Sequence, residues 1–325
     1  MKRPLLFLLL LALTGCAASR HTGSYPASAA PGEKQYAVIL SMDAFRWDLA
    51  DRSHTPTLDS LARVGTYAEV FPVYPSNTFP SHYSMATGLH PDHHGVVNNA
   101  FFDKMQGRRL SVFDAEDVRI PGFWGGEPIW NTVERQGLTA NIFMWPGSDV
   151  PVNGRQATVW TRYSSKPSYY ERADWVIDAM TRPEAEIPDL VMWYFEQPDA
   201  AMHTYGPESP EAVAQAERID SVLRYFFREI RRSPVFDRIN FIVTADHGMA
   251  GLSPERYLNL YGLLDSAQVV RTVPGTPFGI EVRREYVPEA LRRLRATGHI
   301  EAWERDKMPR RFRYGQHPSR LTNLV

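Results

Sequence analysis

Three short apolar runs, each followed by acidic or histidine side chains, constrain the fold of this chain more than any other feature. The runs are Tyr36–Met42, Leu190–Phe195 and 241–245. Each is rich in β-branched or aromatic residues and is bounded by polar ones, which is typical of a buried strand. Long helical patterns separate the runs. This alternation predicts an α/β fold with a mostly parallel sheet and crossover helices.

The polar residues that follow these runs are of the kinds that bind metal ions. They are Asp43 after the first run, Asp199 and His203 after the second, and Asp246 and His247 after the third. In open α/β sheets, ligands gather beyond the carboxyl ends of the strands, and every group lies at such an end. Carboxylate oxygen combined with neutral imidazole suits zinc rather than magnesium or calcium. Three crowded carboxylates also need cations between them, so we expect a two-ion site.

A separate segment, YPSNTFPSHY at 74–83, supplies a candidate nucleophile. Thr78 precedes an apolar run, 79–87, that is predicted to be a helix ending at Gly88. Unpaired backbone N–H groups and the helix dipole favour anions at a helix start, so a hydroxyl there is well placed to attack phosphorus. The alternative is that Thr78 only caps the helix.

Further patterns continue the alternation of helices and strands. Helices are predicted to start at Pro56, Pro128 and Pro210, and the last extends to Arg231 with apolar residues at helical spacing. A strand is predicted at 140–144. The region 269–325 is expected to form short strands and one helix beside the metal site.

The motifs along the chain resemble those of the nucleotide pyrophosphatase/phosphodiesterase family of the alkaline phosphatase superfamily. Besides the Thr78 segment, the matching stretches are SMDAFR at 41–46, TGLHPDHHGVVNN at 87–99, WGGEPIW at 124–130, WPGSD at 145–149, YFEQPD at 194–199, HTYGP at 203–207 and TADHGM at 244–249. They occur in the order and spacing of the family from about residue 37 onward. The resemblance implies an alkaline-phosphatase-like sheet sandwiched by helices, a three-layer α/β/α architecture.

The resemblance also implies roles for single residues. Thr78 is expected to be the nucleophile and to pass through a phospho-threonine intermediate, while Asn99 donates its amide to a phosphate oxygen. One zinc is expected on Asp43, Asp246, His247 and the Thr78 oxygen, and a second on Asp199 and His203. Phe79 is expected to stack on a nucleobase, with Tyr163 opposite. The alternative for these two rings is that they are ordinary core aromatics.

One departure from the family concerns the second zinc. In the family, this ion takes a third ligand from a histidine in a Gly-x-His-Gly motif near the C-terminus, and no histidine after Met249 has that context. The simplest explanation is that the C-terminal end of the catalytic domain is missing from the sequence. The other is that His299 or His317 replaces the ligand.

The N-terminus predicts export. A basic start, an apolar run at 5–13 and the sequence LTGC at 13–16 resemble a bacterial lipoprotein signal. Cleavage before Cys16, the only cysteine, would leave it lipidated, and alanines at 17 and 18 favour the outer membrane, facing the periplasm. A plain signal peptide is the alternative. We thus expect a signal peptide at 1–15, a flexible tether at 16–35 and a catalytic domain at 36–325.

The charge balance narrows the class of partner. The chain has 36 Lys and Arg against 37 Asp and Glu, which argues against a nucleic-acid-binding surface.

The function that the motifs and the family resemblance predict is zinc-dependent hydrolysis of phosphodiester or pyrophosphate bonds in nucleotides or related diesters. Two alternatives remain. One is a related phosphatase, phosphonate hydrolase or lipid-head hydrolase. The other is a non-catalytic ligand-binding lipoprotein with an incomplete second zinc site. Oligomeric state is left open.

Overall fold

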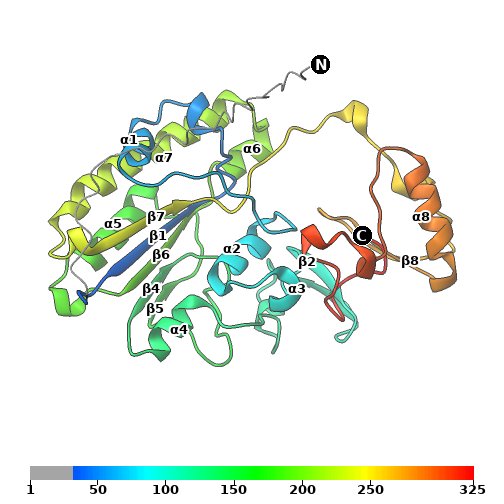
Figure 1. The fold of residues 1–325 in the computed structure, drawn as a ribbon, viewed down its shortest axis with the longest axis horizontal. Coiled ribbons are helices and arrows are strands. Elements are labelled where there is room, and N and C mark those ends of the chain that lie inside the picture. Colours follow the sequence, from blue (N-terminus) through cyan, green and yellow to red (C-terminus); the bar gives the residue numbers. More distant parts are fainter. Residues whose placement is uncertain (1–31) are drawn as a thin grey trace, which may run out of the picture.

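The computed structural model describes residues 32–325, and a five-stranded parallel sheet lies at its centre (Figure 1). The strand order is β5-β4-β6-β1-β7. The strands are β1 (Tyr36–Met42), β4 (Ala140–Phe143), β5 (Val159–Thr161), β6 (Leu190–Phe195) and β7 (Ile239–Thr244). The predictions for the signal peptide, for Cys16 and for most of the tether concern residues outside this described range.

The register of the three central strands aligns their carboxyl ends. β1 pairs with both β6 and β7, and Ser41 lies opposite Tyr194 on one side and Thr244 on the other. The residues that follow the strands therefore leave the sheet at the same edge. Asp43, Asp199 and Asp246 are among them, which fulfils the geometric condition for a shared site.

Helices cover both faces of the sheet, so the predicted three-layer α/β/α fold is confirmed (Figure 1). One layer contains α1 (Pro56–Val64), α5 (Tyr169–Met180), α6 (Asp199–Tyr205) and α7 (Pro210–Glu229); the other contains α2 (Thr78–Thr87) and α4 (Ile129–Arg135). Leu40 and Trp193 pack toward the first layer with Phe226 of α7. Ile142 and Met192 pack toward the second with Trp130 of α4.

Local sequence signals set the helix ends. α5 begins with a capping box in which the side chains of Ser168 and Glu171 bond each other's backbone N–H groups. α2 ends at Gly88, whose φ of 68° is a left-handed conformation that glycine adopts without steric cost. Its start differs by one residue from the prediction, because Asn77 is the capping position and Thr78 is the first helical residue. Similarly, Pro128 precedes α4 and α7 ends at Glu229.

The remaining elements form a second lobe beside the sheet (Figure 1). They are α3 (Pro91–His94), the hairpin of β2 (Ala100–Asp103) and β3 (Arg108–Ser111), the hairpin of β8 (Val269–Val273) and β9 (Gly279–Val282), and α8 (Val287–Ala296). The C-terminal residues return to this lobe, where the Tyr314 hydroxyl donates to the Val97 carbonyl at 2.9 Å and Arg320 binds Asp103 at 3.0 Å.

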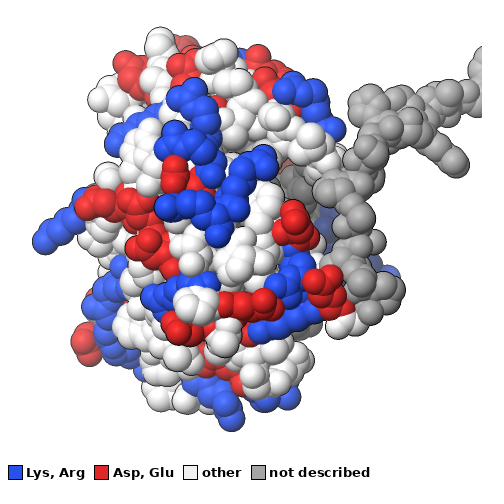
Figure 2. Space-filling model, turned by 90° about the vertical axis from the view of Figure 1, so that its left-hand side faces the viewer, with Lys and Arg blue, Asp and Glu red and all other residues white. Residues whose placement is uncertain are grey.

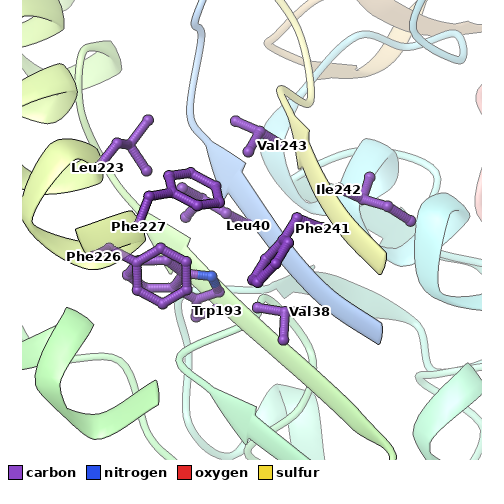
Figure 3. Close-up of a pocket in the computed structure, with 9 residues that line it drawn as sticks. All are labelled: Val38, Leu40, Trp193, Leu223, Phe226, Phe227, Phe241, Ile242 and Val243. Carbon is purple, nitrogen blue, oxygen red and sulfur yellow. The ribbon is translucent and has the colours of Figure 1, made fainter. Parts of the chain in front are cut away.

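β7 is an edge strand of the sheet, with an apolar face of Ile239, Phe241 and Val243 and a second face on which Ile242 lies between Asn240 and Thr244. Phe241 and Val243 pack toward α7, whereas Ile242 points to the opposite side and is 47% exposed (Figure 3). The apolar gap in Figure 3 lies between β1, β6, β7 and α7. All the residues that line this gap are apolar, so it is part of the hydrophobic core and offers no group for catalysis.

The surface carries mixed charge on the face shown in Figure 2, where acidic and basic side chains are interspersed. Within residues 32–325, no helix combines the length and the apolar composition needed to cross a lipid bilayer.

Candidate active site

The residues after β1 and β7 converge at the carboxyl edge of the sheet. Nε2 of His247 lies 3.4 Å from an oxygen of Asp43 and 3.2 Å from an oxygen of Asp246. Among the described residues, these three are the group whose ligand atoms all lie within 4.8 Å of one another. The structure thus brings together three of the predicted metal-binding residues.

The orientation of His247 suits a metal ligand. Its Nδ1 lies 2.9 Å from the Gly248 carbonyl oxygen, which can only accept a hydrogen bond, so Nδ1 carries the hydrogen. Nε2 is left with a lone pair that faces the carboxylates. A histidine that ligates a metal usually has its other ring N–H fixed in this way.

The surroundings shift the pKa values of Asp43 and Asp246 in opposite directions. Burial, then the negative charges of Asp246 and Asp199, raise the pKa of Asp43 well above its usual range. Burial also acts to raise the pKa of Asp246, but His82 and His247 outweigh it, and the pKa of this carboxyl is lowered. Asp246 is further fixed by the backbone N–H groups of Ala44 and His247, at 3.0 and 2.9 Å.

Asp199 and His203 form a pair next to this group. Both belong to α6, where Nε2 of His203 lies 3.4 Å from the Asp199 carboxylate. The Asp199 N–H donates to the Asp43 carbonyl at 3.1 Å, which ties the start of α6 to the end of β1. Burial raises the pKa of Asp199, although His203 and His247 oppose the shift. The side chain of His203 is 70% exposed.

Buried carboxylate oxygens in this region lack hydrogen-bond partners. They are Oδ1 of Asp43, Oδ2 of Asp246 and Oδ1 of Asp199. Buried polar atoms are almost always paired, and an unpaired carboxylate oxygen is especially unfavourable. The donor set, carboxylate oxygens with a histidine lone pair, therefore fits a bound cation and matches the ligand preference of zinc.

Thr78 reaches this cluster from the start of α2. Its hydroxyl oxygen lies 3.3 Å from Nε2 of His247. The Phe79 N–H donates to the side-chain oxygen of Asn99 at 3.2 Å, which holds the Asn99 carboxamide at the first turn of the helix, beside Thr78. The helix start, with its field that favours anions, thus points at the proposed metal ligands.

The predicted base-stacking pair remains a prediction. Phe79 packs edge-on against Phe113, with ring centroids 5.7 Å apart, and near Trp124. Tyr163 is 49% exposed and packs edge-on against Tyr194 at 6.2 Å. Tyr163 is therefore not a core residue, whereas Phe79 is partly buried in an apolar cluster.

His299 and His317 lie in other surroundings. His299 is exposed after α8. Nδ1 of His317 accepts from the backbone N–H groups of Ser319 and Arg320, at 3.3 and 3.2 Å, close to Gly95. Within residues 32–325, the hydrogen bonds of His299 and His317 are to residues other than Asp199 and His203.

Two supporting residues received no role from the sequence. Tyr194 donates its hydroxyl hydrogen to Asp43, and His82 lies 3.3 Å from Asp246. A signal for His82 was present, because residues 78 and 82 lie on the same face of a helix. No comparable signal existed for Tyr194, whose partner lies 151 residues away.

The sequence of this chain is similar to those of known proteins. Residues 37–325 match the sequence model of the family described as type I phosphodiesterase/nucleotide pyrophosphatase. Venom phosphodiesterase 2 of Crotalus adamanteus is 35% identical over 231 residues, which are 69% of this chain and 28% of that protein. Human ectonucleotide pyrophosphatase/phosphodiesterase family member 5 is 30% identical over 303 residues, 90% of this chain and 61% of that protein.

A solved structure of a family member also has a similar fold. Murine ectonucleotide pyrophosphatase/phosphodiesterase 5, as an inactive threonine-to-alanine variant in complex with AMP, superposes with a TM-score of 0.81 at 28% identity. The match covers 90% of this chain and 78% of that one. The chain spans less than two thirds of the length of both curated relatives named above. On the family match over residues 37–325, this chain belongs to the type I phosphodiesterase/nucleotide pyrophosphatase family.

Proposed function

We propose that this protein hydrolyses phosphodiester or pyrophosphate bonds by attack of the Thr78 hydroxyl oxygen on phosphorus. The observation that carries the proposal is the contact of Thr78 with His247 at 3.3 Å, at a helix start that faces two buried carboxylates. The attack forms a Thr78–phosphorus ester and releases the leaving group. Water then cleaves that ester and restores the threonine.

Zinc is the proposed cofactor, with two ions. Asp43, Asp246, His247 and the Thr78 oxygen would hold one, and Asp199 with His203 the other. The unpaired oxygens of the three aspartates support this assignment. Bound zinc would supply Lewis-acid stabilisation of charge on the phosphoryl oxygens and on the attacking oxygen.

The protein's own groups orient the substrate. The Phe79 N–H holds the side-chain oxygen of Asn99 at 3.2 Å, which leaves the NH2 group of Asn99 beside Thr78, where it would donate to a phosphate oxygen and stabilise the developing negative charge. We propose nucleotides as the substrate class, with Phe79 and Tyr163 as base-contacting rings. The AMP bound to the murine relative supports this choice.

A comparison of two chromogenic substrates tests the proposal. The protein, with and without added zinc, is given p-nitrophenyl phosphate and a p-nitrophenyl nucleotide diester. Preference for the diester supports the proposal, and preference for the monoester would favour a related phosphatase instead. Ligand binding without turnover would favour the non-catalytic alternative.

We also propose that the protein is exported and is anchored by lipid on Cys16. The support is the sequence alone, namely the apolar run that ends in LTGC. Substitution Cys16→Ser should move the protein from the membrane fraction to the soluble fraction. If the variant stays with the membrane, the anchor proposal is wrong.

A further inference from the structure

His82 is a fully buried histidine beneath the candidate active site. Nδ1 of its ring lies 2.8 Å from the carbonyl oxygen of Thr78 and 3.3 Å from the carboxylate of Asp246. Nε2 lies 2.9 Å from the hydroxyl oxygen of Ser41. One side chain therefore touches the residue that bears the nucleophile, a candidate metal ligand and the strand that leads to Asp43.

The hydrogen on the ring can be placed from these contacts. A carbonyl oxygen only accepts, so Nδ1 carries a hydrogen that it donates to Thr78, with Asp246 close by. The Ser41 hydroxyl donates a hydrogen bond to Nε2, the other ring nitrogen. Because all polar atoms of the ring have partners, its orientation is fixed by hydrogen bonds.

Two aromatic side chains pack against the same ring. Trp145 and Tyr194 each lie edge-on to it, with ring centroids 5.1 Å away. The Trp145 indole N–H also donates to the His82 carbonyl at 3.3 Å. Rotation of the His82 ring is thus opposed by aromatic contacts as well as by its hydrogen bonds.

We propose that His82 is a positioning residue that sets the place of Thr78 relative to Asp246. This inference rests on the proposed function. The ring connects α2, β1 and the end of β7, which are distant in sequence and carry the two halves of the site. Removal of its Nδ1 donor would loosen the first turn of α2 against the carboxylates, so the hydroxyl and the ligands would lose their alignment.

A set of substitutions tests the proposal. Asparagine places an N–H donor where Nδ1 lies, glutamine places one where Nε2 lies, and leucine offers none. We expect His82→Leu and His82→Gln to lower kcat and zinc affinity by about 10- to 100-fold, with little change in KM. We expect His82→Asn to stay close to the wild type. Zinc affinity is measured by competition with a chromogenic chelator, without substrate.

His94 provides a matched control. It is also fully buried. Its Nε2 bonds the hydroxyl of Ser84 at 2.9 Å, and Ser84 lies in α2, the helix that contains His82, but away from the site. His94→Leu should lower the melting temperature and leave kcat and zinc affinity unchanged. If kcat instead falls in step with melting temperature in both leucine variants, or if His82→Asn is as impaired as His82→Leu, His82 has no positioning role.

An independent measurement separates this proposal from the proposed function. Nitrogen-15 NMR of the imidazoles should show a slowly exchanging hydrogen on Nδ1 of His82, and an Nδ1 without hydrogen would overturn the proposal. If the wild type shows that hydrogen but hydrolyses neither substrate, the proposed function fails. The zinc affinities of the variants and the NMR signal then decide the role of His82.

Discussion

The hydroxyl of Tyr194 donates a hydrogen bond to the carboxylate of Asp43 in the buried region at the carboxyl ends of β1 and β6. The other oxygen of Asp43 has no partner. Tyr194 therefore holds the carboxylate in one orientation and leaves its free oxygen aimed at the site. This is how an outer residue typically orients a metal ligand.

Substitution Tyr194→Phe should lower zinc affinity by about 10- to 100-fold, because it leaves an oxygen of Asp43 unpaired without changing the ring. Chelator competition measures the affinity. Tyr225→Phe is a matched control, since the Tyr225 hydroxyl also bonds an aspartate. Its partner is Asp174 at 2.5 Å, and the two residues lie in α7 and α5. Equal zinc affinity in wild type and Tyr194→Phe would contradict the role given to this hydroxyl.

Substitution Thr78→Ala should reduce kcat on the nucleotide diester by at least about 10³-fold, because the attacking oxygen is removed. Binding of AMP should persist, and Thr78→Ser should keep part of the activity. Thr87→Ala is the control, as Thr87 lies at the far end of α2 and bonds only the backbone there. Full activity in Thr78→Ala would show that another group attacks phosphorus.

Zinc should stabilise the folded protein as well as activate it. An ion that binds only the folded state at about 100 times its Kd adds about 2.7 kcal/mol to the free energy of unfolding. Thermal denaturation with and without a chelator should show this shift, and Asp43→Asn should remove most of it. Equal shifts with magnesium would argue against the carboxylate–imidazole site as a zinc site.

His94 should make stability depend on pH below neutrality. Burial lowers its pKa to about 3, and its Nδ1 accepts from the Val96 N–H, so the folded protein holds the neutral ring. Between pH 7 and pH 5 the unfolded chain takes up a proton that the folded chain does not. The neutral His94 ring therefore contributes stability above pH 6.5, the pKa of an unfolded histidine. The free energy of unfolding falls as the pH drops below that value, by about 2 kcal/mol at pH 5.

Denaturant unfolding of the wild type and of His94→Gln at both pH values isolates this contribution. The variant should be less stable at pH 7, and the gap between the two proteins should shrink by about 2 kcal/mol at pH 5. A gap that stays constant would mean that His94 does not account for the pH dependence.

The edge strand β7 should promote self-association. An edge strand offers unpaired backbone groups to other chains, and the apolar side chain of Ile242 is 47% exposed on this one. Ile242→Lys should reduce association measured by light scattering. Leu252→Lys is the control, because Leu252 is 98% exposed but lies outside any strand. Equal effects of the two substitutions would point to general surface hydrophobicity.

The sequence alone determined the elements and the chemical types of the site. The three central strands are contiguous apolar runs, and the start of α2 is marked by adjacent residues, so short-range patterns suffice to predict them. The order of motifs along the chain likewise predicted the family. Helix ends were off by a residue or two, as at Thr78 and Pro128, because several neighbouring residues can serve as the cap.

The tertiary structure decided which of these residues meet. The register of β1 with β6 and β7 brings Asp43, Asp199 and Asp246 to one edge, and no local pattern encodes that register. The contacts of His82 and Tyr194, and the exposure of β7, likewise depend on packing between segments more than 100 residues apart in the chain. Such contacts arise from complementary shape and hydrogen bonding in the folded core, which a linear pattern does not record.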